Sequence, residues 1–398
     1  MCIIILGMKE DNVILMKPGT GGTKKSPRRG ILAFVRHQFE QAFLYQDFAN
    51  TWRNVPVTIR FRCTNRCNEN CICCFECSGP NNPLHVLPVA DIAFYQNAMQ
   101  SLQGVFMTGG EWSLIYDVDA DYMWRVFDAL DLRCADAYHI QTNCRWVFGP
   151  HSEKIYADLR RIQDKLSATG KVLKLDVSVD RYRSAASLDG VRELICRIGA
   201  DNHFQNTKIR ILSTQLDYGM TGHRILQPDY FKARGVALDF EPRNIMFPLF
   251  QVFYVNGKRM VIHEENVTMN IGRAAENKMG YKIVYPEKQC AGLTSDDRYM
   301  ELSFREDGTV KWHGYYDWDI MTPYRDAHGQ NKPIEQIKQE LIQKAWRHRL
   351  KQNCTEALWS MIPIVRDIRS KRIHRQITDS YRQNEKKIVY RANWQAER

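Results

Sequence analysis

Short β-rich runs alternate with helical patterns through the middle of the chain, and this alternation constrains the fold more than any other feature. Six predicted strands cover Thr58–Arg62, Val105–Met107, Ala137–Gln141, Val172–Val179, Lys208–Leu212 and Val236–Phe240. Helical patterns separate them near 88–102, 119–130, 152–168, 187–199 and 224–233. Repeated strand–helix units predict an α/β fold with a parallel sheet and right-handed crossovers.

Composition limits the class of protein. The 398 residues are 44% hydrophobic and 25% charged, which allows a large core and two or three domains. Apolar runs such as Phe247–Val255 are far too short to cross a bilayer, so we expect no membrane span. Twelve cysteines without a secretory signal favour a reducing, cytoplasmic compartment and metal binding over a disulfide framework.

Cysteines crowd into one short loop. Six lie between Cys63 and Cys77, and in that loop only Cys67, Cys71 and Cys74 have the spacing C-x3-C-x2-C. Three thiolates from one turn can hold three irons of a [4Fe–4S] cluster and leave the fourth iron without a protein ligand. An open metal position is where a metal site does chemistry.

A zinc knuckle is the alternative for this loop, because Cys71 with Cys74, and Cys74 with Cys77, each form a C-x2-C pair. Structural zinc needs four closed ligands, usually from two such pairs brought together, and no further C-x2-C pair follows in the sequence. The spacing therefore favours an iron–sulfur cluster.

Polar motifs end two of the predicted strands. Gly109 and Gly110 would let a ligand approach the backbone closely, and Glu111 would present a carboxylate to an ammonium group. Ser178 and Asp180 lie at the end of a later strand. Because ligands of α/β sheets bind at the carboxyl ends of strands, ligand contact is favoured over a solvated turn or a helix cap.

The segment Thr64–Phe75 resembles the cluster loop of the radical S-adenosylmethionine (radical SAM) enzymes, whose signature is Thr-Asn-x-Cys-Asn-x-x-Cys-x-x-Cys followed by an aromatic residue. Further landmarks follow in the family's order. Val105–Glu111 resembles the Gly-Gly-Glu strand, Tyr138–Asn143 the Thr-Asn-Gly strand and Leu175–Asp180 the Ser-x-Asp strand. Two positions depart from the pattern, since Trp112 replaces Pro and Cys144 replaces Gly.

This resemblance implies a partial (β/α)6 barrel over residues 55–248, with the cluster on Cys67, Cys71 and Cys74. It implies that the reduced cluster, fed by an external donor such as flavodoxin or ferredoxin, cleaves S-adenosylmethionine to a 5′-deoxyadenosyl radical that abstracts hydrogen from a substrate. The residues predicted to contact this cofactor are Phe75, Thr108, Gly109, Gly110, Glu111, Asn143, Ser178 and Asp180.

Antiparallel signals follow the barrel. Two predicted hairpins are Val252–Tyr254 with Met260–Ile262, and Tyr299–Phe304 with Thr309–Trp312. The stretch 285–345 weakly resembles the SPASM or twitch extension of radical SAM enzymes, which binds auxiliary clusters through cysteines. His313 stands where the family has Cys, and only Cys290 and Cys354 remain, so we expect a degenerate extension without an auxiliary cluster.

The predicted divisions are 1–54, a hairpin, basic loop and helix; 55–248, the barrel; 249–330, the β extension; and 331–398, helices with a basic tail. Residues 364–398 hold +6 of the formal net charge of +11. Isoleucines at roughly helical spacing predict a packing helix there. The alternative is a basic arm that docks an acidic peptide or a nucleic-acid backbone.

We expect a radical SAM enzyme that modifies a peptide or protein, because the extension is SPASM-like. The alternative is a nucleotide or nucleic acid substrate, which the positive net charge of the chain would favour. A non-catalytic iron–sulfur or zinc protein is a third. The Gly109–Glu111 motif argues against the third, because a purely structural metal site needs no receptor for a methionine amine.

Overall fold

The computed structural model describes residues 57–72, 74, 76–99, 102–179, 183–204, 207–214, 225–240, 250–266, 277, 300–313 and 320–360, with Gln46 and Ala49. The chain divides into two compact units, Met1–Phe48 and Ala49–Arg398, and the sheet with its helices belongs to the second. The predicted hairpin of 1–30 and the basic tail of 364–398 lie outside the described residues. Of the predicted helix 31–50, Gln46 and Ala49 are described, and both are helical.

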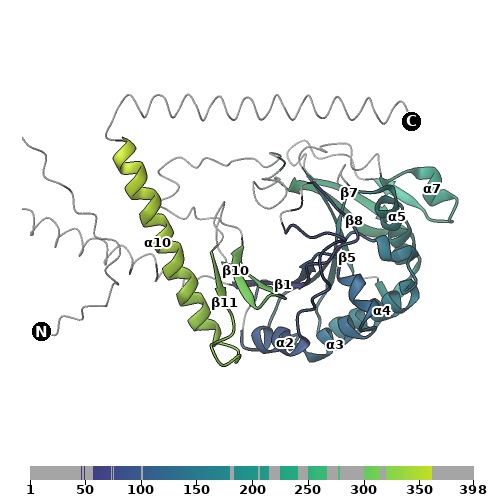
Figure 1. Ribbon diagram of the computed structural model, residues 1–398. Helices are drawn as coiled ribbons and strands as arrows, with labels where there is room; N and C mark the ends of the chain where they lie inside the picture. Colours follow the sequence, from purple (N-terminus) through teal and green to yellow (C-terminus); the bar gives the residue numbers. More distant parts are fainter. Residues whose placement is uncertain are drawn as a thin grey trace, which may run out of the picture. The chain divides into compact units, whose positions relative to one another are not determined.

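All strands of the described residues belong to one sheet (Figure 1). They are β1 (Val57–Thr64), β2 (Gly104–Gly109), β3 (Tyr138–Thr142), β4 (Leu173–Ser178), β5 (Lys208–Thr214), β6 (Leu238–Phe240), β7 (Phe250–Val255), β8 (Lys258–Asn266), β9 (Met300–Arg305), β10 (Thr309–His313) and β11 (Met321–Pro323). Their order is β11-β10-β9-β1-β2-β3-β4-β5-β8-β7-β6. The α/β class is confirmed, but the sheet is open and does not close into a barrel.

The centre of the sheet is parallel and its two edges are antiparallel. The parallel part of the sheet runs from β9 to β8 in the order β9-β1-β2-β3-β4-β5-β8, and every pair within it is parallel. Antiparallel β10 and β11 extend the sheet beyond β9, and β7 and β6 extend it beyond β8. Both predicted hairpins are confirmed as β7–β8 and β9–β10.

The predicted sixth parallel strand is wrong. Val236–Phe240 contributes only the three-residue β6, which pairs antiparallel with β7 at the sheet edge. The parallel place beside β5 is taken by β8, a nine-residue strand of the hairpin that comes next in the chain. A local sequence pattern predicts that a strand exists but not which strand it pairs with. β8 is longer than β6 and can form more backbone hydrogen bonds with β5.

Side chains alternate across the two faces of the sheet. On β4, Leu173, Leu175 and Val177 lie buried on what we call the apolar face, and Lys174, Asp176 and Ser178 lie on the polar face. β1 follows the same rule, with Ile59, Phe61 and Cys63 on the apolar face and Thr58, Arg60 and Arg62 on the polar face.

Helices cover the apolar face. They are α2 (Val89–Asn97), α3 (Tyr122–Ala129), α4 (Ser152–Ala168), α5 (Ala185–Ala200), α7 (Pro228–Lys232) and α10 (Ile334–Ser360), of which α3, α4 and α5 follow one another along one side of the sheet (Figure 1). α4, predicted with the same bounds, buries Ile155, Leu159, Ile162 and Leu166. This i, i+4, i+7, i+11 spacing places one apolar stripe against the strands.

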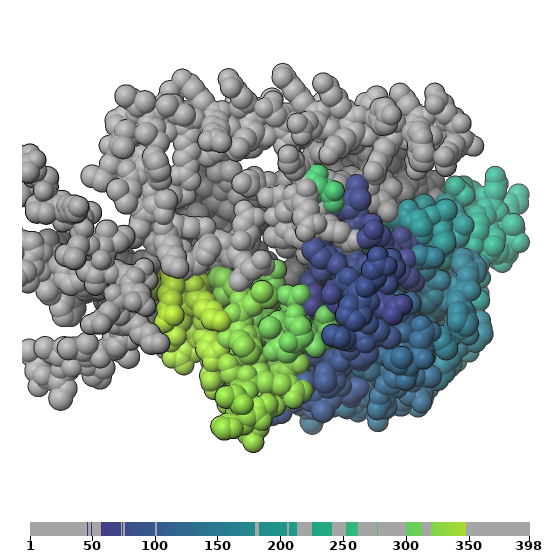
Figure 2. Space-filling model, viewed as in Figure 1, coloured from purple at the N-terminus to yellow at the C-terminus, as the bar shows by residue number. Residues whose placement is uncertain are grey.

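The C-terminal part of the described chain packs against α2. Figure 2 shows the green and yellow segment of β9 to α10 beside the blue residues that follow β1. Tyr95 of α2 stacks on Phe304, with 4.3 Å between ring centroids, and donates to the carbonyl of Tyr324 at 2.7 Å. Asp91 accepts hydrogen bonds from Tyr324 and Arg325. Among the described residues, no helix is both long and apolar enough to cross a bilayer.

Candidate functional site

The cysteine loop begins where β1 ends and leads to α2. Cys67 and Cys71 are buried and Cys74 is half-buried. The backbone N–H of Cys67 donates to the carbonyl of Gly79 at 3.1 Å, and that of Cys74 donates to the carbonyl of Cys71 at 3.2 Å. Backbone bonds therefore fold the loop back on itself and keep the predicted ligands in one short segment at the strand end.

The two glycines at the end of β2 pack against the cysteine loop. A Cβ at Gly110 would lie 1.9 Å from the carbonyl oxygen of Arg66, and one at Gly109 would lie 2.5 Å from that of Thr64. The N–H of Gly110 donates to Thr64 at 2.7 Å, and the N–H of Glu111 donates to Arg66 at 2.8 Å. The group that approaches both glycines in the structure is the backbone that carries Cys67, and their contact with a ligand stays a prediction.

Glu111 is fully buried at this junction. Its carboxylate accepts hydrogen bonds from Thr142 Oγ1 at 3.0 and 3.2 Å, from the N–H of Asn143 at 2.8 Å and from the N–H of Ser113 at 3.4 Å. Burial raises the pKa of Glu111, and these hydrogen bonds oppose the rise. No cation of a described residue forms an ion pair with it, and its hydrogen-bond donors are the hydroxyl of Thr142 and the two backbone N–H groups.

Asn143 connects the end of β3 to the cysteine loop. Its Nδ2 lies 2.7 Å from Asn68 Oδ1 and 3.7 Å from Cys67 Sγ, while its backbone N–H holds Glu111. The N–H of Glu69 also points at the Cys67 sulfur, at 3.4 Å. Three of the predicted site residues, Cys67, Glu111 and Asn143, are thus linked by direct hydrogen bonds between elements far apart in sequence.

The environment of the Cys67 thiol favours its protonated form. Burial, followed by the charge of Glu111, raises its pKa to about 11, and the N–H of Glu69 and the charge of Arg183 oppose this. Among the described residues, no three metal-ligating side chains lie close enough together to hold an ion. The donor set nevertheless fits a cluster, because soft thiols come from one turn and N–H groups point at a sulfur.

The remaining predicted residues lie on the polar face or outside the described residues. Thr108 Oγ1 donates to Gln141 Oε1 at 2.7 Å, and Gln141 Nε2 donates to Ser178 Oγ at 3.3 Å, so a hydrogen-bonded chain crosses β2, β3 and β4. Phe75 and Asp180 lie outside the described residues, and their predicted contacts stay predictions.

Several residues of the junction were not among the predicted contacts. Thr142 donates to Glu111 and accepts from the N–H of Cys144 and from Trp146 Nε1. Glu69 accepts from Ser184 and Ser187 at the start of α5 and lies 3.7 Å from Arg145. Thr142 could have been found from its place at the end of β3. Glu69 carries no local signal, because the two serines that donate to it lie more than a hundred residues away.

Both departures from the radical SAM pattern are buried beside this junction. Trp112 is 1% exposed, and its Nε1 has no hydrogen-bond partner among the described residues. Cys144 is fully buried and has a φ of 63°, in the left-handed region that glycine adopts most readily. Burial raises the pKa of Cys144 well above its ordinary value, so the thiol stays neutral.

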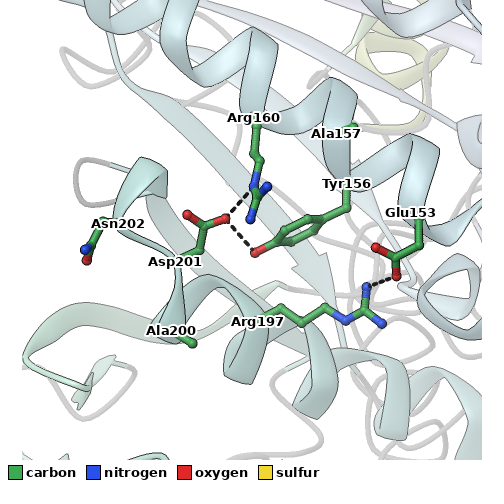
Figure 3. A pocket seen from close by; sticks show the side chains of 8 residues that line it. All are labelled: Glu153, Tyr156, Ala157, Arg160, Arg197, Ala200, Asp201 and Asn202. Atoms are coloured by element: carbon green, nitrogen blue, oxygen red, sulfur yellow. Dashed lines mark hydrogen bonds and ion pairs between the residues drawn. The ribbon is translucent and has the colours of Figure 1, made fainter.

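A separate hollow of about 670 Å³ lies on the helix layer between α4 and α5 (Figure 3). Its charges are paired with one another: Arg160 Nε donates to Asp201 at 2.6 Å, and Arg197 Nη1 donates to Glu153 at 2.8 Å. Tyr156 completes the group with a 3.3 Å bond to Asp201. None of the predicted site residues lines this hollow.

Comparison with known proteins adds little to this geometry. No protein-family model and no curated protein matches the chain. Streptococcus suis SuiB bound to S-adenosylmethionine matches with a TM-score of 0.31 and 11% identity, over 64% of this chain and 60% of that chain. SuiB bound to precursor peptide SuiA matches with a TM-score of 0.31 and 10% identity, over 75% and 67%. The first match spans less than two thirds of the solved chain, and likenesses of this size carry no argument about family, ligand or substrate.

Proposed function

We propose that this chain is a radical SAM enzyme that acts on a peptide or protein. The observation that carries the proposal is the hydrogen-bonded contact among Cys67, Glu111 and Asn143. These residues come from three separate motifs, which resemble three radical SAM landmarks. A metal loop with a purely structural role would give no reason for a buried, cation-free carboxylate to join it.

In this proposal Cys67, Cys71 and Cys74 hold three irons of the cluster. The cluster and S-adenosylmethionine supply a 5′-deoxyadenosyl radical that takes a hydrogen atom from the substrate. Glu111 binds the methionine ammonium, and the N–H of Asn143 keeps its carboxylate turned toward the strand end. Gly109, Gly110, Thr108 and Ser178 line the same edge, with Phe75 and Asp180 as further predicted contacts.

The Asn143 amide and the Glu69 N–H orient the Cys67 sulfur and stabilise its thiolate form. Glu69 in turn is fixed by two serines at the start of α5, so the loop is tied to the helix layer. These contacts give the loop a defined position at the strand end. The electron that the chemistry needs comes from an external donor such as flavodoxin or ferredoxin.

The test is anaerobic reconstitution with iron and sulfide, followed by S-adenosylmethionine, dithionite and mass spectrometry. We expect 5′-deoxyadenosine from the wild-type protein and from Cys63→Ala, and none from Cys67→Ala. Cys63 is a matched control because it is a buried thiol of the adjoining strand, on the apolar face. A protein that takes up one zinc and no iron would replace this proposal with the non-catalytic binding protein.

A further inference from the structure

The polar face carries a group of cations below the strand ends that bear the candidate site. Lys174 on β4 and Lys208 on β5 are register partners. Arg210 pairs with Val261 of β8, so Lys208 and Arg259, each two residues earlier on its strand, are neighbours on the same face. Lys208 and Arg259 are exposed and Lys174 is half-buried. We call Lys174, Lys208 and Arg259 the cationic row.

Asp176, which follows Lys174 on the polar face of β4, is already engaged by other side chains. Arg210 donates from Nε and Nη2 to the two oxygens of Asp176, at 2.9 and 2.7 Å, and His139 Nδ1 lies 2.9 Å from the same carboxylate. Burial lowers the pKa of His139, so the ring stays neutral and adds no positive charge. Asp176 therefore forms its ion pair with Arg210 and forms none with the cationic row.

No carboxylate of a described residue forms an ion pair with the cationic row. Burial, and then the charges of Arg210 and Lys208, lower the pKa of Lys174, and the charges of Asp176 and then Asp136 oppose them. Mutual repulsion of this kind is relieved when an anion binds.

The charge is confined to a short stretch of the face. Toward β1, the polar face carries Phe106 stacked on neutral His139, with 4.0 Å between centroids, and Arg60 paired with Glu301. A nucleic-acid strand carries a charge about every 3.4 Å and would need a longer track of cations. The row matches one acidic side chain better than a polyanion.

Geometry relates the row to the reacting end of the sheet. Lys174 and Ser178 are four residues apart on one strand, about 13 Å at ~3.3 Å per residue. An extended peptide covers the same length in about four residues. We propose that the cationic row binds the side-chain carboxylate of an acidic residue that lies about four positions from the residue to be modified in a peptide substrate. This inference rests on the proposed function.

The experiment measures binding and needs neither cluster nor cofactor, so its failure is distinct from failure of the 5′-deoxyadenosine assay. Two fluorescein-labelled, C-terminally amidated dodecapeptides differ only in four central residues, Glu in one and Gln in the other. Because the three cations act together on the acidic residues, anisotropy should show about tenfold tighter binding of the Glu peptide at low salt. A Gln peptide with a free C-terminus tests whether a terminal carboxylate binds the cationic row as tightly as a side-chain carboxylate does.

The double variant Lys174→Gln/Lys208→Gln should lose this preference, and Lys232→Gln on α7 should keep it. Lys232 is an exposed lysine, and its replacement removes one positive charge where the double variant removes two. Circular dichroism checks that both variants fold. A benzoylphenylalanine four residues from the acidic block should crosslink to tryptic peptides that contain Gln141 or Ser178, and one ten residues away should not.

Three results would overturn the proposal. Equal affinity for the Glu and Gln peptides would remove the acidic specificity. A preference that survives in the double variant would place the anion site elsewhere, for example on the basic 364–398 segment. Displacement of the peptide by a twelve-nucleotide single strand at lower concentration than by unlabelled Glu peptide would make the ligand a nucleic acid.

Discussion

Replacing Gly110 by Ala tests the junction between β2 and the cysteine loop. The new Cβ would lie 1.9 Å from the Arg66 carbonyl oxygen, whereas ordinary contact begins at 3.4 Å, so the two backbones must separate by about 1.5 Å. Gly110 does not have a positive φ, so the substitution adds a methyl group without forcing a disallowed backbone conformation. The effect is therefore steric.

The shift would break two short backbone hydrogen bonds, from Gly110 to Thr64 and from Glu111 to Arg66. Each broken bond leaves buried polar groups unsatisfied, at about 1–3 kcal/mol per group. We expect Gly110→Ala to lower the free energy of unfolding by about 2–4 kcal/mol in urea titrations. It should also lower the iron bound after reconstitution, because Cys67 moves with Arg66.

Gly199→Ala is the matched control. Its Cβ would lie 2.4 Å from a side-chain carbon of Val255, at the contact of α5 with β7, away from the cysteine loop. This variant should bind as much iron as the wild type, even where its free energy of unfolding is lower. If Gly110→Ala takes up iron as the wild type does, the loop can relax without moving its ligands, and the reasoning is refuted.

The other predictions concern the ligands, the buried carboxylate and Cys144. Alanine variants of the predicted ligands should lose the charge-transfer absorbance of the cluster, whereas Cys63→Ala keeps it and the wild type binds about four irons per chain. The ligand variants are Cys67→Ala, Cys71→Ala and Cys74→Ala. Because burial raises the pKa of Glu111, the native state holds its proton more tightly than the unfolded state, and stability should fall as pH rises from about 4.5 to the native pKa. Glu111→Gln should flatten that slope in urea titrations across this pH range and weaken S-adenosylmethionine binding at least tenfold in calorimetry; an unchanged slope contradicts the assignment. Since Cys144 has a φ of 63°, Cys144→Gly should be about 1 kcal/mol more stable than Cys144→Ala by thermal denaturation, the reverse of the ordinary order.

The sequence predicts local elements well because local elements depend on local patterns. α4 has the predicted bounds, since its apolar stripe and its length leave no alternative. The wrong prediction concerns the strand that pairs with β5, which is β8 and not β6. Pairing depends on backbone contacts between segments about fifty residues apart, and no residue of β8 indicates a parallel partner.

In the candidate site, too, the residues of local motifs could be predicted from the sequence, and the contacts between distant segments could not. Cysteine spacing and the Gly-Gly-Glu motif are local, so Cys67 and Glu111 could be named from the sequence. Their connection through Asn143 depends on sheet register, which sets the ends of β2 and β3 side by side. Glu69 could not be found in advance, because its role comes from serines at the start of α5.

The Cys144 departure shows how one motif position can keep its backbone and change its side chain. The residue after Thr142-Asn143 must enter the left-handed region, because its N–H turns back to Thr142 Oγ1 and its carbonyl meets Gly190, where a Cβ would lie only 2.1 Å away. A glycine fits this conformation without cost, whereas Cys144 accepts about 1–2 kcal/mol of strain. That cost is offset by complete burial of a small apolar side chain. Complete burial therefore gives the thiol a packing role in this fold.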